Sequence, residues 1–137
     1  MTTILSRLCV IMILALCVSG CANEKYGLKI LLPQWKEAWN SGDISNIISL
    51  MHPKSEILEQ YNSNIETKKA IEAEISELID EFGKVERWKI GKYIKSKQQY
   101  FVRITYTKKG TATGTISAAK DSDGTWLITH FAIGGPK

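Results

Sequence analysis

Acid–base chemistry near neutral pH needs a side chain such as histidine, and the histidines of this 137-residue chain are His52 and His130. His130 follows Trp126 and Ile128 at strand spacing, so we expect it on the same inward face, where it could act as a general acid or base. No Asp or Glu shares that face, and a lone histidine is more often a core or rim residue. His130 is therefore the one catalytic candidate, and His52, directly before Pro53, is interpreted as a cap or turn residue.

The remaining residues offer no second catalytic set and no metal-binding pattern. The acids near the expected strands are Glu86, close to a strand start, and Asp121 and Asp123, in a turn. The run from Asp121 to Gly124 is similar to the start of a calcium loop, but it lacks the other ligands and the distal glutamate. No Cys/His spacing suits zinc and no glycine-rich loop suits a phosphate, so we expect no metal and no cofactor.

A cysteine with a distinctive setting stands at position 21. Residues 8–18 form an apolar run of eleven residues, and Ser19, Gly20 and Cys21 follow it. A membrane-spanning helix needs about 20 apolar residues, so this run is interpreted as a cleaved signal rather than a retained anchor. An apolar run, small residues and then cysteine resemble the signal of bacterial lipoproteins.

The lipoprotein resemblance implies cleavage between Gly20 and Cys21 and lipid attached to the Cys21 sulfur, usually with a further acyl chain such as palmitate on the amine. Cys9 and Cys17 would leave with the signal, so Cys21 would be the sole cysteine of an exported chain. More than one acyl chain gives stable anchoring to a membrane. Since Ala22 is not the aspartate of inner-membrane retention signals, we expect the outer membrane, facing the periplasm, in a Gram-negative cell, and otherwise the outer face of the cell membrane. The alternative is an ordinary secretory signal.

Two short helices are expected after a brief tether. The first begins close to Pro33, since proline is tolerated only near a helix start, and its apolar residues are Leu31, Leu32, Trp35, Ala38 and Trp39. Gly42 ends it, and Asp43 caps a second helix that stops at His52-Pro53.

A third helix is the longest expected element. Ser63 with Glu66 predicts a capping box at its start, Gly83 predicts its end, and its apolar stripe is Ile71, Ile75, Leu78, Ile79 and Phe82. The segment before it, Lys54 to Asn62, could be a short strand or an irregular turn.

Beyond Gly83 the apolar period changes to two, which predicts strands joined by turns at Lys108-Lys109-Gly110 and at Asp121 to Gly124. The predicted fold class is α+β, with two short helices and one long helix against an antiparallel sheet of about four to five strands.

Two stretches resemble the nuclear transport factor 2-like superfamily, which includes ketosteroid isomerase and small polyketide cyclases. The first runs from Trp35 to Asp43 and on to His52-Pro53, and the second runs from Asp123 to Phe131. The resemblance implies a cone-shaped domain over residues 29–137, after a signal over 1–20 and a lipidated tether over 21–28. It also implies a curved sheet, a homodimer as one possible assembly, and a pocket between helices and strands. Candidate pocket residues are Trp35, Trp39, Trp88, Tyr100, Tyr106, Trp126 and His130.

Charge is distributed unevenly behind a modest net value of +4. Residues 54–81 hold three basic and eight acidic side chains, whereas residues 84–120 hold ten basic side chains and one acidic side chain. We favour an acidic helix face packed across a sheet with basic edges. The alternative is a basic surface for an anionic envelope partner. Nucleic acid is excluded as a partner, since no nucleic-acid-reading motif is present.

The leading hypothesis is a membrane-anchored lipoprotein whose small domain binds an apolar ligand or a partner protein of the cell envelope without catalysis. One alternative is a small pocket enzyme of isomerase, cyclase or hydrolase type that uses His130. The other is an adaptor for anionic envelope surfaces that uses the basic sheet.

Overall fold

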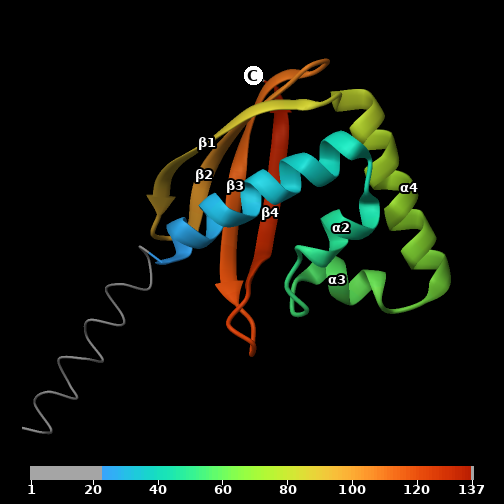
Figure 1. Cartoon of the computed structure of the whole chain (residues 1–137), viewed down its shortest axis with the longest axis horizontal. Helices are drawn as coiled ribbons and strands as arrows, with labels where there is room; N and C mark the ends of the chain where they lie inside the picture. Colours follow the sequence, from blue (N-terminus) through green and yellow to red (C-terminus); the bar gives the residue numbers. More distant parts are fainter. Residues whose placement is uncertain (1–22, 137) are drawn as a thin grey trace, which may run out of the picture.

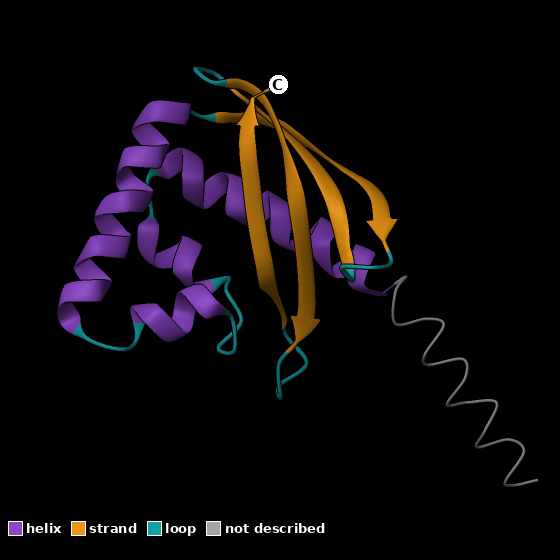
Figure 2. Cartoon of the chain, turned by 180° about the vertical axis from the view of Figure 1, so that it is seen from behind, coloured by secondary structure: helices purple, strands orange, loops and turns teal. Residues whose placement is uncertain are grey.

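The computed structural model describes residues 23–136, which form four helices on one side of a single four-stranded antiparallel sheet (Figures 1 and 2). The strands lie in the order β1-β2-β3-β4. The α+β class is confirmed, with four strands in the sheet. The elements are an N-terminal helix over residues 23–41, α2 (Ile44–Ser49), α3 (Glu56–Tyr61), α4 (Ile65–Phe82), β1 (Val85–Ile94), β2 (Gln99–Tyr106), β3 (Gly110–Lys120) and β4 (Trp126–Pro136).

The N-terminal helix is longer than predicted and crosses the concave side of the sheet (Figure 1). It is helical from residue 23, the first residue that the structure describes, so residues 23–28 of the expected tether are helical, and Pro33 lies in its interior with an exposed side chain. Proline removes one intrahelical hydrogen bond. Leu28 and Leu32 of the same helix are fully buried, and this burial offsets the loss. The prediction that the helix starts near Pro33 is therefore wrong.

The turn after this helix was predicted correctly, whereas the structure of the segment beyond α2 was not. Gly42 has a φ of 69°, and the Asp43 side chain accepts a hydrogen bond from the Asn46 N–H at 3.2 Å, so both predicted ends are confirmed. Beyond α2, Met51 forms an isolated parallel bridge with Ile128, which joins the helical layer to β4. The undecided segment from Lys54 to Asn62 contains a third short helix, α3.

Helix α4 occupies the predicted range, with a different residue at its start. The Asn64 side chain accepts from the Thr67 N–H at 2.8 Å, so Asn64 is the cap in place of the predicted Ser63. Gly83 ends the helix with a φ of 80°, as predicted. Ile71 and Ile75 are its buried residues.

Bulges change which side chains face the helices along the outer strands. In β4, Ser117 pairs with His130 while the next residue, Ala118, pairs with Ile128, so Thr129 is an extra residue. An extra residue moves every later side chain to the opposite face. The buried residues of the sheet face that contacts the helices are Val85, Tyr100, Val102, Ile104, Tyr106, Ala112, Ile116, Ala118 and Ile128.

Side chains at the end of the N-terminal helix bind the backbone that leads into β1. Trp39 Nε1 donates to the Gly83 carbonyl at 2.9 Å, and this bond is buried. Asn40 binds both polar groups of the Val85 backbone: Oδ1 accepts from the N–H at 2.7 Å, and Nδ2 donates to the carbonyl at 3.0 Å. These bonds hold the helix against the edge strand and fix the position of Trp39.

Candidate ligand-binding cavity

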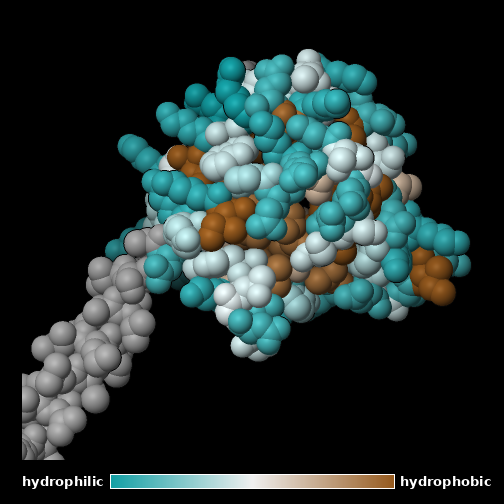
Figure 3. All heavy atoms as spheres, viewed as in Figure 1, coloured by the Kyte–Doolittle hydropathy of each residue, from teal (hydrophilic) through white to brown (hydrophobic). Residues whose placement is uncertain are grey.

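An apolar cavity of about 220 Å³ lies between the N-terminal helix, α2, α4 and the inner face of the sheet. Its wall is made of side chains from every layer of the domain. Figure 3 shows apolar atoms reaching the surface between the N-terminal helix and the α2–α3 segment. The lining residues are Trp35, Trp39, Ile47, Met51, Ile57, Ile75, Leu78, Phe82, Tyr106, Phe131 and Ile133.

Five aromatic rings form a continuous series along this cavity. Trp35 contacts Phe131 at a centroid distance of 5.1 Å and Trp39 at 5.4 Å. Trp39 in turn lies 5.7 Å from Tyr106, which meets Phe82 edge-on at 4.9 Å. Tilted and edge-on contacts at these distances are the favoured aromatic arrangements, so the rings support one another and hold the wall in one shape.

Tyr106 is the residue of this apolar wall that carries a hydroxyl group. Its side chain is 3% exposed, and burial raises the pKa of its hydroxyl well above the ordinary range, so the group stays protonated and can donate. Within residues 23–136 no side-chain nitrogen or oxygen that is fully occluded lacks a hydrogen-bond partner, and no hydrogen bond of the Tyr106 hydroxyl is found there. The hydroxyl therefore keeps some accessible surface and has no hydrogen-bond partner among the described residues.

The structure brings Trp35, Trp39 and Tyr106 together at the cavity and places the other predicted aromatics elsewhere. Tyr100 is buried beside the Tyr93 ring, at a centroid distance of 4.9 Å. Trp88 lines a shallow hollow near Pro33 on the β1 side of the N-terminal helix. Trp126 packs over Gly27, with Lys120 Nζ 5.4 Å from its ring.

His130 does not face the cavity, so the expectation of an inward-facing histidine is wrong. Its side chain is exposed, and Nε2 lies 3.3 Å from Thr115 Oγ1. The extra residue Thr129 places Phe131 on the inner face in its stead. His130 lines a neighbouring groove of about 330 Å³ that shares Met51, Ile57 and Phe131 with the cavity. An exposed His130 outside the cavity removes the geometric basis for pocket catalysis by this residue.

His52 lies in the turn between α2 and α3. Its Nδ1 accepts a hydrogen bond from the Lys54 N–H at 3.1 Å, and its own N–H donates to the Ile128 carbonyl at 2.7 Å. Both hydrogen bonds stabilise the turn and join it to β4.

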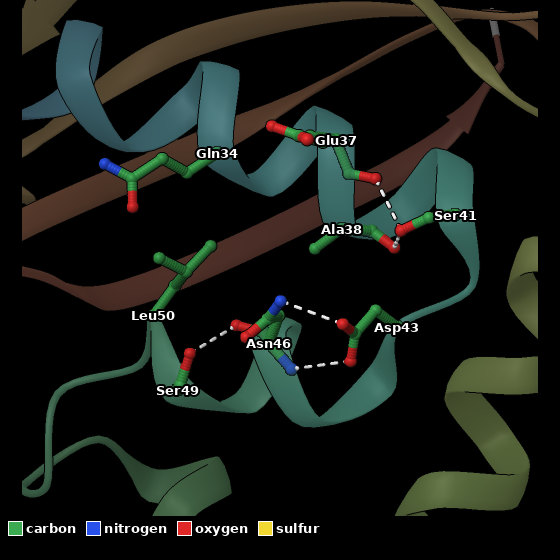
Figure 4. A pocket seen from close by; sticks show the side chains of 8 residues that line it. All are labelled: Gln34, Glu37, Ala38, Ser41, Asp43, Asn46, Ser49 and Leu50. Atoms are coloured by element: carbon green, nitrogen blue, oxygen red, sulfur yellow. Dashed lines mark hydrogen bonds between the residues drawn. The ribbon is translucent and has the colours of Figure 1, made fainter.

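A second hollow, of about 350 Å³, lies between the N-terminal helix and α2 and is polar (Figure 4). Several of its polar groups form hydrogen bonds with residues of the hollow itself. Ser41 Oγ donates to the Glu37 carbonyl at 2.9 Å, and Asn46 Nδ2 donates to Asp43 Oδ2 at 2.8 Å. Ser49 Oγ donates to the Asn46 carbonyl at 2.7 Å. Because these groups are occupied in capping their own helices, the hollow offers few free donors to a ligand.

The sequence pattern missed most of the cavity wall. Phe82 and Ile75 belong to the predicted apolar stripe of the long helix, but periodicity does not separate core positions from cavity positions. Strand spacing did not predict Phe131 and Ile133 on the inner face, because the bulge at Thr129 changes the face of later residues. Ile57 was not predicted because the structure of its segment was left undecided. Cys21 and Gly20, with the whole predicted signal, lie outside the described residues.

Other site types are not found in the part of the chain that the structure describes. Residues 23–136 contain no group of three or more His, Cys, Asp or Glu side chains that could hold a metal ion. No helix in the same range is long and apolar enough to cross a membrane. Comparisons with known protein families, with curated proteins and with solved structures find no match to this chain.

Proposed function

We propose that this protein is a membrane-anchored lipoprotein whose small domain binds an apolar ligand carrying one hydrogen-bond acceptor. The observation that carries the binding role is the aromatic cavity, whose wall includes Tyr106, a residue with an unpartnered hydroxyl. Apolar cavities with few polar groups are the usual form of small-molecule sites. The helix, Gly-Asp turn, helix order and the helix-covered sheet are compatible with the nuclear transport factor 2-like cone, which we propose as the family.

The size of the cavity restricts the ligand class. An engineered apolar cavity of about 150 Å³ holds benzene. A cavity of about 220 Å³ therefore suits a body of about ten non-hydrogen atoms. The Tyr106 hydroxyl stays protonated at neutral pH and can donate its proton, so a matching ligand group is an acceptor such as a ketone, ester or ether oxygen.

Native mass spectrometry of the purified protein tests for a co-purified ligand, and tryptophan fluorescence tests binding directly. The probe is a medium-chain ketone of about ten non-hydrogen atoms, which matches the size of the cavity. Its binding should change tryptophan fluorescence because Trp35 and Trp39 line the cavity. We expect saturable quenching, and a Kd about fivefold higher in Tyr106→Phe, the equivalent of one neutral hydrogen bond. Unchanged fluorescence together with no added mass would refute ligand binding.

A cavity-blocking variant with a matched control separates binding inside the cavity from adsorption to the surface. Leu78 is half-buried and lines the cavity, whereas Leu58 is half-buried against the core outside it. Leu78→Trp should abolish ketone binding and Leu58→Trp should preserve it. Equal loss in both variants would place the ketone elsewhere.

Lipidation of Cys21 is the second part of the proposal, and it has its own test. The mass of the N-terminal peptide from the mature protein should correspond to a chain that begins at Cys21 and carries a diacylglycerol group. Cys21→Ala should release the protein from the membrane fraction. An unmodified peptide that begins at another residue would overturn the anchor and leave the ligand-binding role intact.

A further inference from the structure

The face of the sheet that points away from the helices carries an unusual pairing of charges. In Figure 2 this face lies toward the viewer, with the described helices behind it. Lys89 on β1 lies directly opposite Arg103 on β2, and Arg103 lies opposite Thr113 on β3. Like charges directly opposite each other on a sheet are destabilising.

Protection of a strand edge explains only one of these two cations. Lysine is a common guard on exposed edges, and Lys89 stands on the edge strand β1. Arg103 stands on β2, which is paired on both sides, so it guards no edge. The one ion pair within residues 23–136 joins Lys109 to Glu81 at 2.8 Å, so neither Lys89 nor Arg103 is neutralised by a described carboxylate.

The two cations border a hollow of about 290 Å³ without an acidic residue in its wall. Phe101 is 50% exposed beside it, and its Cβ lies 3.1 Å from the point where a side chain on Gly91 would begin. Glycine at position 91 therefore lets the Phe101 side chain lie close to the β1 backbone. The complete lining is Lys89, Gly91, Phe101, Val102, Arg103 and Thr113.

We propose that this hollow binds the phosphate group of an organic phosphate, separately from the ligand of the apolar cavity. A guanidinium, an ammonium and a hydroxyl in one row match the three terminal oxygens of a phosphate monoester, and guanidinium–phosphate contacts are among the strong charge-assisted hydrogen bonds. The anion offsets the repulsion between Lys89 and Arg103, and the organic part packs on the exposed Phe101 ring.

Titration with inorganic phosphate and with phenyl phosphate, followed by NMR of backbone amides, tests the site. Chloride at the same ionic strength serves as the reference, since it screens charge without bridging the two cations. Both probes should shift amide signals of β1 and β2 around Lys89 and Arg103. Phenyl phosphate should bind several-fold more tightly than inorganic phosphate, and Phe101→Ala should remove that advantage while preserving binding of inorganic phosphate.

Neutral variants provide the decisive comparison. Arg103→Gln and Lys89→Gln should each raise the Kd for phosphate about tenfold, the equivalent of one charge-assisted hydrogen bond. Lys69→Gln, which removes the same charge from an exposed position on α4, should leave the Kd unchanged. Equal effects of all three variants, or shifts no larger than those with chloride, would overturn the phosphate site. Equal affinity for the two probes would overturn the organic-phosphate assignment.

Discussion

Asn40 is the residue whose removal should most weaken the contact between the N-terminal helix and the sheet. Its amide binds the N–H and the carbonyl of Val85 at 2.7 and 3.0 Å, in the manner of a neighbouring strand. Val85 is 2% exposed and stands at the start of the edge strand. Asn40→Ala therefore leaves two backbone groups of a buried residue without these partners.

The expected cost follows from this geometry. Each hydrogen bond contributes about 1 kcal/mol net, and a buried group left unsatisfied costs about 1–3 kcal/mol. Because Asn40 itself is half-buried, water replaces part of the loss, and we expect Asn40→Ala to lower the free energy of unfolding by about 2–3 kcal/mol. For a domain of this size that corresponds to a fall in Tm of about 10 °C.

Chemical denaturation monitored by tryptophan fluorescence measures this loss. Asn46→Ala is the matched control, because the Asn46 amide donates to Asp43 on an exposed surface and its removal should cost less than about 0.5 kcal/mol. Asn40→Asp should retain the bond from the Val85 N–H and oppose the Val85 carbonyl with a second anionic oxygen, so acid should partly restore its stability. A loss below about 1 kcal/mol for Asn40→Ala, or equal losses for both alanine variants, would refute this reasoning.

Three further predictions concern other parts of the domain. Burial raises the pKa of the Glu24 carboxyl above 4.5, so its charged form is disfavoured in the folded state. Glu24→Gln should therefore raise Tm at pH 7. That gain in Tm should shrink as the pH falls through the raised pKa toward 4.5. Gly114→Ala should lower the free energy of unfolding by about 1–3 kcal/mol in urea denaturation, since its Cβ would overlap the backbone at Ala132; no change would mean that β4 moves freely. In phosphate-free buffer Arg103→Gln should raise the free energy of unfolding by about 0.2–1 kcal/mol through relief of repulsion from Lys89, and a loss of stability would contradict that repulsion.

Local signals were sufficient for the elements whose ends depend on backbone chemistry. Gly42 and Gly83 adopt positive φ values, and Asp43 caps α2, all at the predicted helix ends. Such signals did not predict that the N-terminal helix extends before Pro33, because the preference of Pro33 for a first turn is overridden by burial of Leu28 and Leu32 in the core. Burial in the tertiary structure, which the local sequence does not indicate, determines how far this helix extends.

The candidate site shows the same division between local and non-local information. Trp35, Trp39 and Tyr106 were predicted to line the pocket that the family resemblance implies, and they line the cavity. His130 was misplaced because strand parity holds only while every residue pairs, and one extra residue at Thr129 reverses it. Pairing partners across a sheet, rather than the spacing within one strand, determine where such a bulge falls.

The uninterrupted N-terminal helix has a consequence for how the cavity is presented to its surroundings. Trp35 is twelve residues after residue 23, the first residue that the structure describes and already helical, which places it about 18 Å along the helix axis from there. With lipid on Cys21, as we propose, only Ala22 would stand in the sequence between the anchor and the described part of this helix. The cavity would then stay at a set height above the bilayer surface, within reach of molecules that leave or enter the outermost lipid layer. Spacer residues inserted after Cys21 would change that height without altering the cavity itself.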